Sequence, residues 1–331
     1  MAYVVSHPIQ YQAPLLRRIA REPDIDLHVY FLSDLSSGGY RDPGFGTWIE
    51  WDVPLTEGYE HTFLSTTKEV SRGGPLRSEL RAGHFDAVWI HGYKEPAARV
   101  AIAAARSNGI AVLLRGESHL GLVHGLLARW YRRVVLPAVF ARADGFLAIG
   151  GANRDFYRRY GVNDDKIHLM PYAVDNEFFS RAAREAGAGR AALRAELGIG
   201  DNTPVILFAS KITHVKGADV LIEGFRQLRR DTDAHLLLVG DGDLRAALEA
   251  RGDPDVTFVG FKNQSELPKY YDLCDVFVLP SRWEPWGLVI NEAMNAAKPI
   301  VTTDVVGAAR DLVQEGISGR VVRAGDPVAL A

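Results

Sequence analysis

Cysteine is nearly absent from this chain, which has a single one, Cys274, in 331 residues. One cysteine excludes an intrachain disulfide framework and any metal site built from several cysteines, and it fits a reducing compartment. Long hydrophobic runs are missing too, since no stretch approaches the roughly 20 apolar residues of a membrane-spanning helix. The first residues lead into a short apolar strand rather than a signal peptide. We therefore expect a cytoplasmic protein.

The chain also lacks a strong charge of either sign. Its 38 lysines and arginines nearly balance its 41 aspartates and glutamates, which gives a formal net charge of -3. Such a balance provides no global attraction to nucleic acid or to anionic lipid, so a basic site has to be local. We expect no nucleic-acid partner. The 10 histidines are dispersed and lack the spacing of a zinc site, so we predict no metal site.

Short apolar runs recur along the chain at intervals that leave room for a helix between them. Strands that are nearly continuous in apolar residues and alternate with helices indicate parallel sheets covered on both faces. The length is about twice that of a typical single domain, which favours two domains of α/β architecture. The predicted strands form two series: 3–6, 27–32, 87–92, 111–116, 145–150 and 167–172, then 205–210, 235–240, 256–261, 276–281, 299–304 and 319–322.

Two segments break this rhythm. Residues 181–204 are rich in alanine, arginine and glycine without a strand signal, which predicts a helical linker and then a turn. We accordingly place an N-terminal domain at 1–175, a linker at 176–203 and a C-terminal domain at 204–331. Residues 36–62 are predicted to form a long insertion over the edge of the first sheet. Its aromatic residues either line a sugar site or pack against the domain; they are Trp48, Trp51 and Tyr59.

The stretch SRWEPWGLVINEAMNAAKPIV, residues 281–301, follows a predicted strand directly. Ligands of open α/β sheets bind beyond the carboxyl ends of strands, so this position is favoured for a site. Glu284 falls in a turn, and Glu292 lies on a predicted helix over 288–297. A carboxylate there needs hydrogen-bond donors, which sugar or ribose hydroxyls and the amides after Gly287 would supply. The alternative is a glutamate that only satisfies free amides of the helix.

Two lysines follow an earlier strand of the same series. Lys211 comes directly after the predicted strand 205–210, and Lys216 precedes Gly217, where a helix is predicted to begin. Two cations facing a helix N-terminus form a clamp for a diphosphate without a metal ion. The alternative is a chance pair of surface lysines.

The stretch VGDGD, residues 239–243, resembles the start of a dinucleotide-binding fingerprint. The third glycine position of that fingerprint is occupied by Arg245, and the first strand of the chain leads into SHPIQYQAP without a glycine. A nicotinamide site is therefore excluded on the motif. We expect Gly240 and Gly242 to permit a tight turn from strand to helix.

Polar and aromatic residues also follow three strands of the first domain. Groups that mix hydrogen-bonding and aromatic side chains suit a ligand with many hydroxyl groups, although any one of them could be a satisfied turn residue. The candidates for an acceptor site are His7, Gln10, Tyr11, Gln12, His91, Tyr93, Arg115 and His119, with Glu117 beside them.

Several stretches of the second half together resemble the C-terminal domain of the family 4 glycosyltransferases, which have the GT-B fold. They are KITHVKGADVLIEGF, VTFVGF, VFVLPSRWEPWGLVINEAMNAAKPIVTTDVVGAARDLV and GISGRVV. The resemblance covers about residues 203–325, and Glu284 and Glu292 meet the E-x7-E element of the family. The first half is more loosely similar, through SHPIQYQAPLLRRIA, GFGTWIEWDVPLTEGY, LLRGESHL and PYAVDNEFF, to members that act in polysaccharide and glycoconjugate biosynthesis.

The resemblance implies two Rossmann-like α/β domains that face a central cleft. It also implies transfer of a sugar from a nucleotide diphosphate donor, UDP- or GDP-linked, with retention of anomeric configuration and without a metal or cofactor. Lys211 and Lys216 would neutralise the diphosphate of the leaving group. Glu284 would meet hydroxyls of the donor sugar, and Glu292 would meet the ribose. Glu284 and the two lysines are thus the catalytic candidates of the second domain.

The remaining donor contacts follow from the same resemblance. The backbone around Gly260 and Phe261 would contact the base. The turn and helix start that would face the sugar and phosphate comprise Trp286, Gly287, Leu288 and Val289. The first domain would bind the acceptor, which is a sugar, a lipid-linked or a small molecule. Arg115 and Glu117 lie where many relatives have a functional histidine, and they are the catalytic candidates of the first domain.

The chain departs from the family pattern at three points. Lys211 stands where arginine is usual, which replaces a bidentate fork by a point charge. Asp311 occupies a position that is often glutamate. The sequence stops in GDPVALA, where relatives continue, so we expect the second domain to be truncated at its C-terminal end.

Two other functions share the expected architecture: a nucleotide-sugar epimerase, and a sugar-nucleotide binding subunit without activity. The amphipathic stretch 126–143 either lies on the inner face of a membrane, as a peripheral contact, or packs as an ordinary helix. The sequence predicts no particular oligomeric state.

Overall fold

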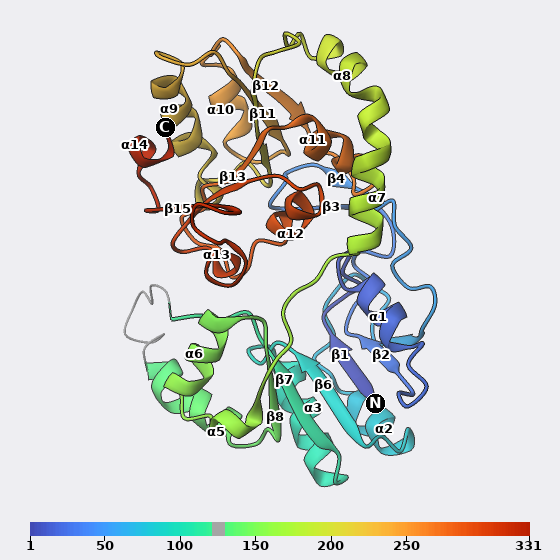
Figure 1. Cartoon of the computed structure of the whole chain (residues 1–331). Coiled ribbons are helices and arrows are strands. Elements are labelled where there is room, and N and C mark those ends of the chain that lie inside the picture. Colours follow the sequence, from blue (N-terminus) through green and yellow to red (C-terminus); the bar gives the residue numbers. More distant parts are fainter. Residues whose placement is uncertain (121–129) are drawn as a thin grey trace. The chain divides into compact units, whose positions relative to one another are not determined.

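The computed structural model describes residues 1–120 and 130–331, which form two α/β units (Figure 1). The first unit consists of Met1–Gly39 and Pro54–Tyr172, and the second of Tyr40–Val53 and Ala173–Ala331. Each unit has its own parallel sheet and its own core. The doubled α/β architecture predicted from the spacing of apolar runs is confirmed.

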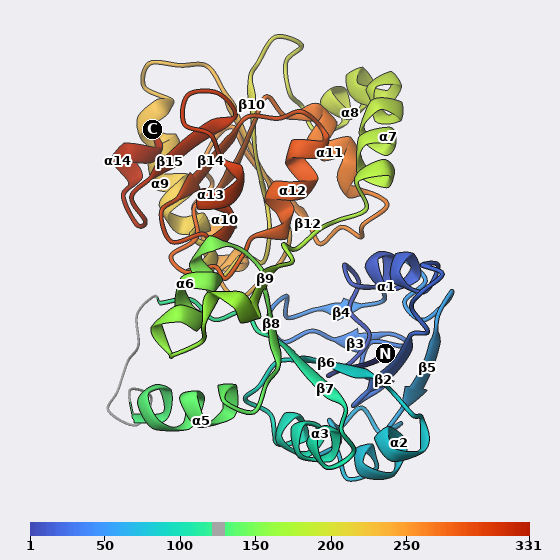
Figure 2. The same ribbon diagram turned by 60° about the horizontal axis from the view of Figure 1, so that its bottom comes forward.

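The first unit is built on a parallel sheet with the strand order β5-β2-β1-β6-β7-β8-β9. Helices α2, α3 and α5 cover one face of this sheet and α1 lies on the other (Figure 2). The strands are β1 (Ala2–Val5), β2 (His28–Phe31), β5 (Glu60–Phe63), β6 (Ala87–His91), β7 (Ala111–Arg115), β8 (Gly145–Ala148) and β9 (Ile167–Leu169). The helices are α1 (Ala13–Ile19), α2 (Leu76–Ala82), α3 (Pro96–Ser107), α5 (Leu136–Phe140) and α6 (Gly151–Arg159).

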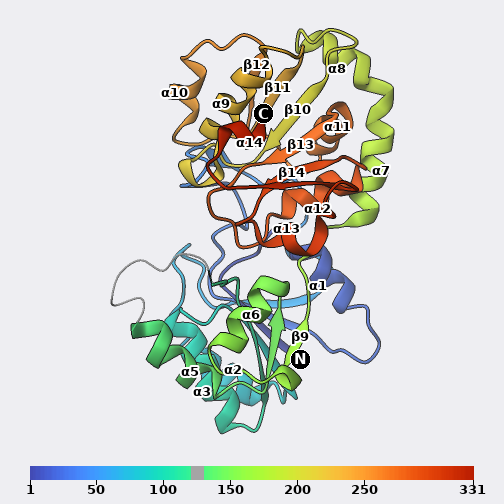
Figure 3. The same cartoon turned by 60° about the vertical axis from the view of Figure 1, so that its left-hand side comes forward.

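The second unit has a parallel sheet with the strand order β12-β11-β10-β13-β14-β15. Helices α9 and α10 lie on one side of this sheet, and α7, α11 and α12 lie on the other (Figure 3). The strands are β10 (Val205–Ala209), β11 (His235–Val239), β12 (Val256–Gly260), β13 (Val276–Leu279), β14 (Ile300–Thr303) and β15 (Gly319–Val322). The helices are α7 (Asn176–Ala186), α8 (Arg190–Glu196), α9 (Ala218–Leu228), α10 (Arg245–Glu249), α11 (Leu267–Leu273), α12 (Leu288–Asn295), α13 (Gly307–Leu312) and α14 (Pro327–Leu330).

The central strands are buried on both faces, which explains their nearly continuous apolar sequence. All five residues of β11 are buried, and so are all four of β1. Within β1, Val4 faces the cluster that contains α3, whereas Tyr3 and Val5 face the cluster that contains α1. Alternate residues of one strand therefore serve two core layers, as expected for a parallel sheet covered by helices.

The segment 36–62 does not lie over the edge of the first sheet as a single insertion. Its last residues begin β5, which pairs with β2 in parallel. Residues Tyr40–Val53 belong to the second unit, where they form a small antiparallel hairpin of β3 (Tyr40–Arg41) and β4 (Trp48–Ile49). The expected position was wrong because aromatic side chains of this segment pack on Phe261 of the second unit.

The stretch predicted as a linker, 176–203, forms α7 and α8, which pack on α11. Asp175 caps α7, since its carboxylate accepts the Phe178 N–H at 2.9 Å, and Phe179 is buried. These residues are therefore part of the second unit rather than a free connection. Arg190 of α8 adds a bidentate ion pair with Asp272 of α11 at 2.9 and 2.5 Å.

The stretch 126–143 was predicted to be an amphipathic helix, but residues 126–129 lie outside the described residues. From Trp130 onward it continues as a π-helical turn, Tyr131–Val135, and then α5. Trp130 and Val134 are exposed, whereas Leu136 and Phe140 belong to the core. No helix among the described residues is long and apolar enough to cross a membrane. Peripheral membrane contact stays a prediction.

Candidate functional site

In the second unit, the turn between β13 and α12 holds Glu284. Its carboxylate accepts a hydrogen bond from the Lys216 ammonium group, and the side chain is almost fully buried. The main chain of Glu284 bridges to Val306, and its carbonyl accepts the Gly307 N–H at 3.0 Å. The turn is thereby fixed to the start of α13. The carboxylate has a defined position and already has a cationic partner.

Glycines place Lys216 and Glu284 next to each other. Gly217 begins α9 with a φ of +75°, and a Cβ there would lie 2.2 Å from the carbonyl oxygen of Pro280. Gly287 begins α12 with a φ of +97°, and its Cβ would lie 2.9 Å from Leu279. Only glycine combines this conformation with such close approach. The two helix starts therefore come together because neither has a side chain at its N-cap.

Lys211 lies two residues after the end of β10 and does not share the carboxylate of Lys216. Its ammonium group donates to Asp42 at 2.8 Å and lies 4.7 Å from the centre of the Phe45 ring. Burial by itself would raise the pKa of Asp42. Hydrogen bonds from Lys211 and from the backbone of Phe45 and Gly44 outweigh that effect and hold the pKa below its ordinary value. Each of the two predicted donor lysines is thus paired with its own carboxylate.

Glu292 is on α12 and accepts a hydrogen bond of 2.6 Å from the Tyr271 hydroxyl of α11. Burial raises the pKa of Glu292 from its ordinary value of 4.5 to about 7, although the hydrogen bond from Tyr271 favours the ionised form. This carboxyl group therefore changes its protonation near neutral pH. Neither its partner nor its environment is shared with Glu284.

Of the predicted base contacts, Gly260 is the last residue of β12 and Phe261 follows it. Gly260 has a φ of +84°, and its carbonyl oxygen accepts the Gly240 N–H at 2.8 Å. The predicted tight turn at Gly240 and Gly242 is confirmed, since a Cβ on either would lie within 2.4 Å of a backbone oxygen. The Phe261 ring is half-buried and is in contact with two aromatic rings of the segment Tyr40–Val53.

The turn residue Trp286 is buried, and its indole N–H donates to the Asn291 side chain at 3.0 Å. Its ring therefore packs inside the unit. Leu288 and Val289 are half-buried in the first turn of α12. Backbone N–H groups in a first helical turn have no acceptor within the helix, so the amides of Gly287, Leu288 and Val289 are suited to an anion or a hydroxyl.

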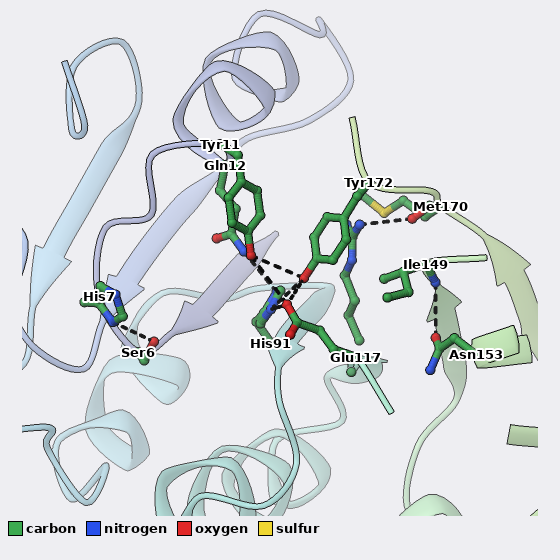
Figure 4. Close-up of polar contacts among 12 residues, drawn as sticks. Ser6, His7, Tyr11, Gln12, His91, Glu117, Ile149, Asn153, Met170 and Tyr172 are labelled. Atoms are coloured by element: carbon green, nitrogen blue, oxygen red, sulfur yellow. Dashed lines mark hydrogen bonds and ion pairs between the residues drawn. The ribbon is translucent and has the colours of Figure 1, made fainter. Parts of the chain in front are cut away.

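In the first unit, polar side chains meet beyond the ends of β1, β6 and β7 (Figure 4). The Tyr3 hydroxyl donates to the Gln12 side-chain oxygen at 2.7 Å, and the Gln12 amide nitrogen lies 3.2 Å from Nδ1 of His91. Because an amide N–H can only donate, Nδ1 of His91 is the acceptor in this arrangement. The proton of neutral His91 is then on Nε2.

Nε2 of His91 faces the second half of this cluster. It lies 3.3 Å from the Tyr172 hydroxyl, which in turn donates to the Glu117 carboxylate. Tyr11 also approaches Glu117, at 3.4 Å. Burial would raise the pKa of Glu117, but hydrogen bonds from His91 and Tyr172 outweigh it, so the pKa lies below its ordinary value. The result is a continuous chain of donors that ends at a partly exposed carboxylate: Tyr3, Gln12, His91, Tyr172, Glu117.

Arg115 lies beside this cluster and is fully buried. Its guanidinium group is 4.5 Å from the centre of the Tyr172 ring and 5.6 Å from that of Trp89, and it donates to the Met170 carbonyl oxygen at 3.0 Å. The guanidinium group thus packs on the face of the Tyr172 ring. This contact is a cation–π interaction, which keeps the hydroxyl of Tyr172 directed at Glu117.

The structure does not bring every predicted acceptor residue into this cluster. Tyr93 is buried against Phe140 in the core of the first unit, so it lies outside this cluster. His7 is 2.9 Å from the Ser6 hydroxyl and lies apart from His91 (Figure 4). Gln10 and His119 form none of the hydrogen bonds that define the cluster, although each has other interactions.

Sequence reasoning missed three residues that complete these arrangements. Tyr3 is inside β1, where its position indicates core packing. Tyr172 lies in the stretch PYAVDNEFF, which was noted for its resemblance alone. Asp42 pairs with a lysine 169 positions away in the sequence. Among the described residues, no group of three or more histidines, cysteines, aspartates and glutamates is arranged to hold a metal ion.

The two α/β units and their glycine-led helix starts fit the GT-B fold of glycosyltransferases. Residues 203–331 match the family model "Glycosyl transferases group 1", and residues 10–173 match "Glycosyl transferase 4-like domain". The D-inositol 3-phosphate glycosyltransferase 1 of Catenulispora acidiphila is 30% identical over 314 residues, with 84% of this chain and 72% of that protein covered. The chain belongs to the family 4 glycosyltransferases.

One further relative and one solved structure are also similar to this chain. The alpha-D-kanosaminyltransferase of Streptomyces kanamyceticus is 33% identical over 202 residues, which are 59% of this chain and 50% of that protein. The chain therefore matches about half the length of that relative. The crystal structure of Anabaena HepE in complex with UDP and glucose has a TM-score of 0.72 and 20% identity, and it covers 99% of this chain and 87% of the Anabaena chain. That likeness supports the fold.

Proposed function

We propose that this protein is a retaining glycosyltransferase. It moves a sugar from a UDP- or GDP-linked donor to an acceptor hydroxyl without a metal ion or a cofactor, in the synthesis of a polysaccharide, glycolipid or other glycoconjugate. The observation that carries the proposal is the Lys216–Glu284 pair at the adjoining starts of α9 and α12. The Lys216 ammonium group, the backbone amides at the start of α12 and the Glu284 carboxylate, which can accept hydroxyl groups, are thereby held close together.

The chemistry required at this point is stabilisation of a departing nucleoside diphosphate. Lys216 neutralises the negative charge that grows on the diphosphate as the bond to the sugar breaks, and the amides of the first turn of α12 support it. A phosphate oxygen takes the place of one carboxylate contact of Lys216, since both are charge-assisted acceptors. Glu284 then accepts hydroxyls of the donor sugar. Glu292 accepts those of the ribose, and Gly260 and Phe261 contact the base.

We infer retention from membership of the family 4 glycosyltransferases, whose E-x7-E element is met by Glu284 and Glu292. The Glu284 carboxylate is bound to Lys216, and the Glu292 carboxylate is bound to Tyr271. Both are therefore positioning groups for a donor with many hydroxyls. Charge neutralisation by lysine also replaces what a divalent cation does for a diphosphate.

The acceptor is assigned to the first unit. The cluster of Tyr3, Gln12, His91, Tyr172 and Glu117 alternates donors and acceptors and ends at a carboxylate whose side chain is 42% exposed. Such an array suits the hydroxyl groups of a sugar-like acceptor. Glu117 holds an acceptor hydroxyl through a charge-assisted hydrogen bond, and His91 fixes the direction of Tyr172.

The test uses a panel of UDP-, GDP- and ADP-sugars with nucleotide release as the readout. We compare the wild-type protein with Glu284→Gln and Lys216→Ala. Lys216→Ala removes the charge that stabilises the leaving group and is expected to lower release by about 10²- to 10³-fold. Glu284→Gln removes the carboxylate that binds Lys216 and the sugar hydroxyls, and it is expected to lower release as well. The control is Lys269→Ala, because Lys269 is in the same unit and its ammonium group lies 5.2 Å from the centre of the Tyr270 ring.

Unchanged release in both Glu284→Gln and Lys216→Ala would contradict the site. Interconversion of one nucleotide sugar into another without an acceptor would identify an epimerase instead. Donor binding in calorimetry without turnover against any acceptor would identify a binding subunit without activity.

A further inference from the structure

The segment Tyr40–Val53, which we name the strap, is encoded between β2 and β5 but belongs to the second unit. It is folded as the hairpin β3–β4, with Tyr40 paired to Ile49 and Arg41 to Trp48. Figure 1 shows this hairpin in blue among the orange elements of the second unit. The strap thus adds a piece from the first half of the sequence to the unit that carries the lysines.

One end of the strap holds Lys211. Oδ1 of Asp42 accepts the backbone N–H groups of Gly44 and Phe45 at 2.8 and 2.9 Å, which closes a tight turn. The same oxygen accepts the Lys211 ammonium group at 2.8 Å. Two bonds within the strap close the turn, and the lysine adds a third to the same oxygen. The lysine is the partner that gains a fixed position.

The turn encloses the Lys211 side chain closely. A Cβ on Gly44 would lie 2.6 Å from Nζ and 2.7 Å from Cδ of Lys211, so a larger residue there would displace the lysine side chain. The Phe45 ring covers Nζ at 4.7 Å. An ammonium group has three N–H donors and Asp42 accepts one, so donors remain for an anion. About a third of the Lys211 side chain, 35%, is exposed for that contact.

The other part of the strap lies on Phe261. The rings of Phe45 and Trp51 are 5.0 and 6.1 Å from that of Phe261, each edge to face. The Asn263 side chain donates to the Glu50 carbonyl oxygen at 2.8 Å, and the Ser265 N–H donates to Asp52 at 3.1 Å. These bonds fix the strap to the loop that follows β12. A single short segment therefore touches both the lysine and the aromatic residue expected at the two ends of a nucleoside diphosphate.

We propose that the strap is a donor-recognition element. Asp42 is a positioning residue that holds Lys211 ready for the diphosphate, and Phe45 and Trp51 complete, around Phe261, an aromatic surface for the nucleobase. This inference rests on the proposed function and extends it, because it assigns the diphosphate contact and the base contact to one continuous segment. A flexible lysine that is already oriented loses less freedom when the donor binds.

The first experiment measures the Kd of UDP and GDP by calorimetry for wild type and Asp42→Asn. Asparagine keeps an oxygen for the two turn N–H groups but removes the charge that orients Lys211. We expect the Kd of the preferred nucleotide to rise about 10-fold. The control is Asp233→Asn, because Asp233 forms a comparable pair with Arg229 at 2.8 Å on an exposed helix end of the same unit. It is expected to change Kd less than about twofold.

A second measurement separates positioning from a general loss of structure. In a Lys211→Met background, Asp42→Asn is expected to have almost no further effect on Kd, because the group it positions is gone. Binding of the free nucleoside, which has no phosphate, is expected to be unchanged by Asp42→Asn. The variant Phe45→Leu is expected to weaken both the nucleoside and the nucleotide.

Each other outcome overturns the inference. Tighter nucleotide binding by Asp42→Asn would mean that Asp42 competes with the diphosphate for Lys211. An equal effect in the wild-type and Lys211→Met backgrounds would mean that Asp42 only stabilises the fold. Wild-type binding that Asp42→Asn and Phe45→Leu leave unchanged would overturn the strap's role while the proposed function stands. A wild-type protein that binds neither UDP nor GDP would overturn both.

Discussion

The two units carry polar clusters of opposite character. In the second unit, Lys211 and Lys216 each pair with a carboxylate, and Lys216 lies at the adjoining starts of two helices. In the first unit, the cluster consists mainly of uncharged donors and acceptors that lead to one carboxylate, Glu117. Its nearby cation, Arg115, donates to a backbone carbonyl oxygen. The difference indicates which ligand each unit suits.

Charge and neutral hydrogen bonds select different ligands. An ion pair between lysine and carboxylate can exchange its anion for a phosphate, because both are charged oxygen acceptors. A chain of tyrosine, glutamine and histidine discriminates by the direction of hydroxyl groups, since each member donates in one direction and accepts in another. The second cluster therefore suits a diphosphate, and the first suits a neutral molecule with many hydroxyls.

The largest expected effect that separates the two clusters is that of Glu117→Gln. Removing this charge is expected to lower the rate of transfer about 10²-fold, as is typical when a group that positions or activates a hydroxyl is lost. The pKa of Glu117 lies below its ordinary value, so the carboxylate is ionised at neutral pH and the wild-type rate does not depend on its titration there. Steady-state transfer assays measure the effect.

The control for Glu117→Gln is Glu95→Gln, because Glu95 is exposed at the start of α3 and forms no capping bond. Nucleotide affinity is expected to be the same in both variants. A weaker nucleotide affinity in Glu117→Gln would contradict the assignment of nucleotide binding to the second unit and acceptor binding to the first.

A second prediction concerns the glycine that brings the charged cluster together. Gly217→Ala would place a Cβ 2.2 Å from the Pro280 carbonyl oxygen at a φ of +75°. We expect the free energy of unfolding to fall by about 1–3 kcal/mol, with weaker nucleotide binding as the helix start shifts. Urea denaturation and calorimetry measure the two effects.

Gly189→Ala is the matched control for Gly217→Ala. Gly189 has a φ of -96° and no atom within 4 Å of an added Cβ. It is expected to leave nucleotide binding unchanged. Equal losses in both variants would show that the close approach at Gly217 is not what assembles the site.

The third prediction is a pH dependence that Glu292 gives to the second unit. The folded-state pKa of Glu292 is about 7, above its ordinary value of 4.5, so the folded protein binds this proton more tightly than the unfolded chain. The contribution to stability is therefore fully present below pH 4.5 and is lost as the pH rises to about 7. Glu292→Gln is expected to remove this decline, on the order of 2 kcal/mol.

Chemical denaturation at a series of pH values tests this decline. Tyr271→Phe serves as a second variant, because the Tyr271 hydroxyl favours ionised Glu292. Its loss is expected to move the decline to higher pH. If the free energy of unfolding of the wild-type protein, relative to that of Glu292→Gln, does not fall between pH 4.5 and 7, the raised pKa assigned to Glu292 is contradicted.

The smallest expected effect is in the uncharged cluster. Tyr3→Phe removes the hydroxyl that donates to Gln12 but keeps the ring contact with Trp89 at 4.0 Å. We expect a loss of about 1 kcal/mol in the free energy of unfolding. Thermal unfolding measures it, and the transfer rate is expected to fall only slightly because Glu117 is at the other end of the chain. A loss of transfer as large as that of Glu117→Gln would show that the cluster acts as a single unit.

The sequence predicted what short-range patterns determine. Runs such as 205–210 and 235–240 correspond to β10 and β11, because a fully buried parallel strand has a nearly continuous apolar sequence. The approach of Lys216 to Glu284 was also predictable, since both follow neighbouring strands and precede helices with glycine at the start. Local spacing was sufficient for both.

What the sequence did not predict depends on contacts between distant residues. The turn at Asp42 meets Lys211 across 169 positions, and nothing in its composition indicates which unit it joins. Tyr172 reaches His91 across 81 positions. Tyr93 was expected in the acceptor site because it follows a strand, but its ring turns into the core instead. A residue after a strand can point either way, and only packing decides.

The central claim is that the second unit binds the nucleotide and the first unit acts on the acceptor. The most direct test measures nucleotide Kd and transfer rate together for Lys216→Ala and Glu117→Gln. We expect Lys216→Ala to weaken nucleotide binding and abolish transfer, and Glu117→Gln to lower transfer about 10²-fold with an unchanged Kd. A Glu117→Gln variant that weakens nucleotide binding as strongly as Lys216→Ala would contradict the account.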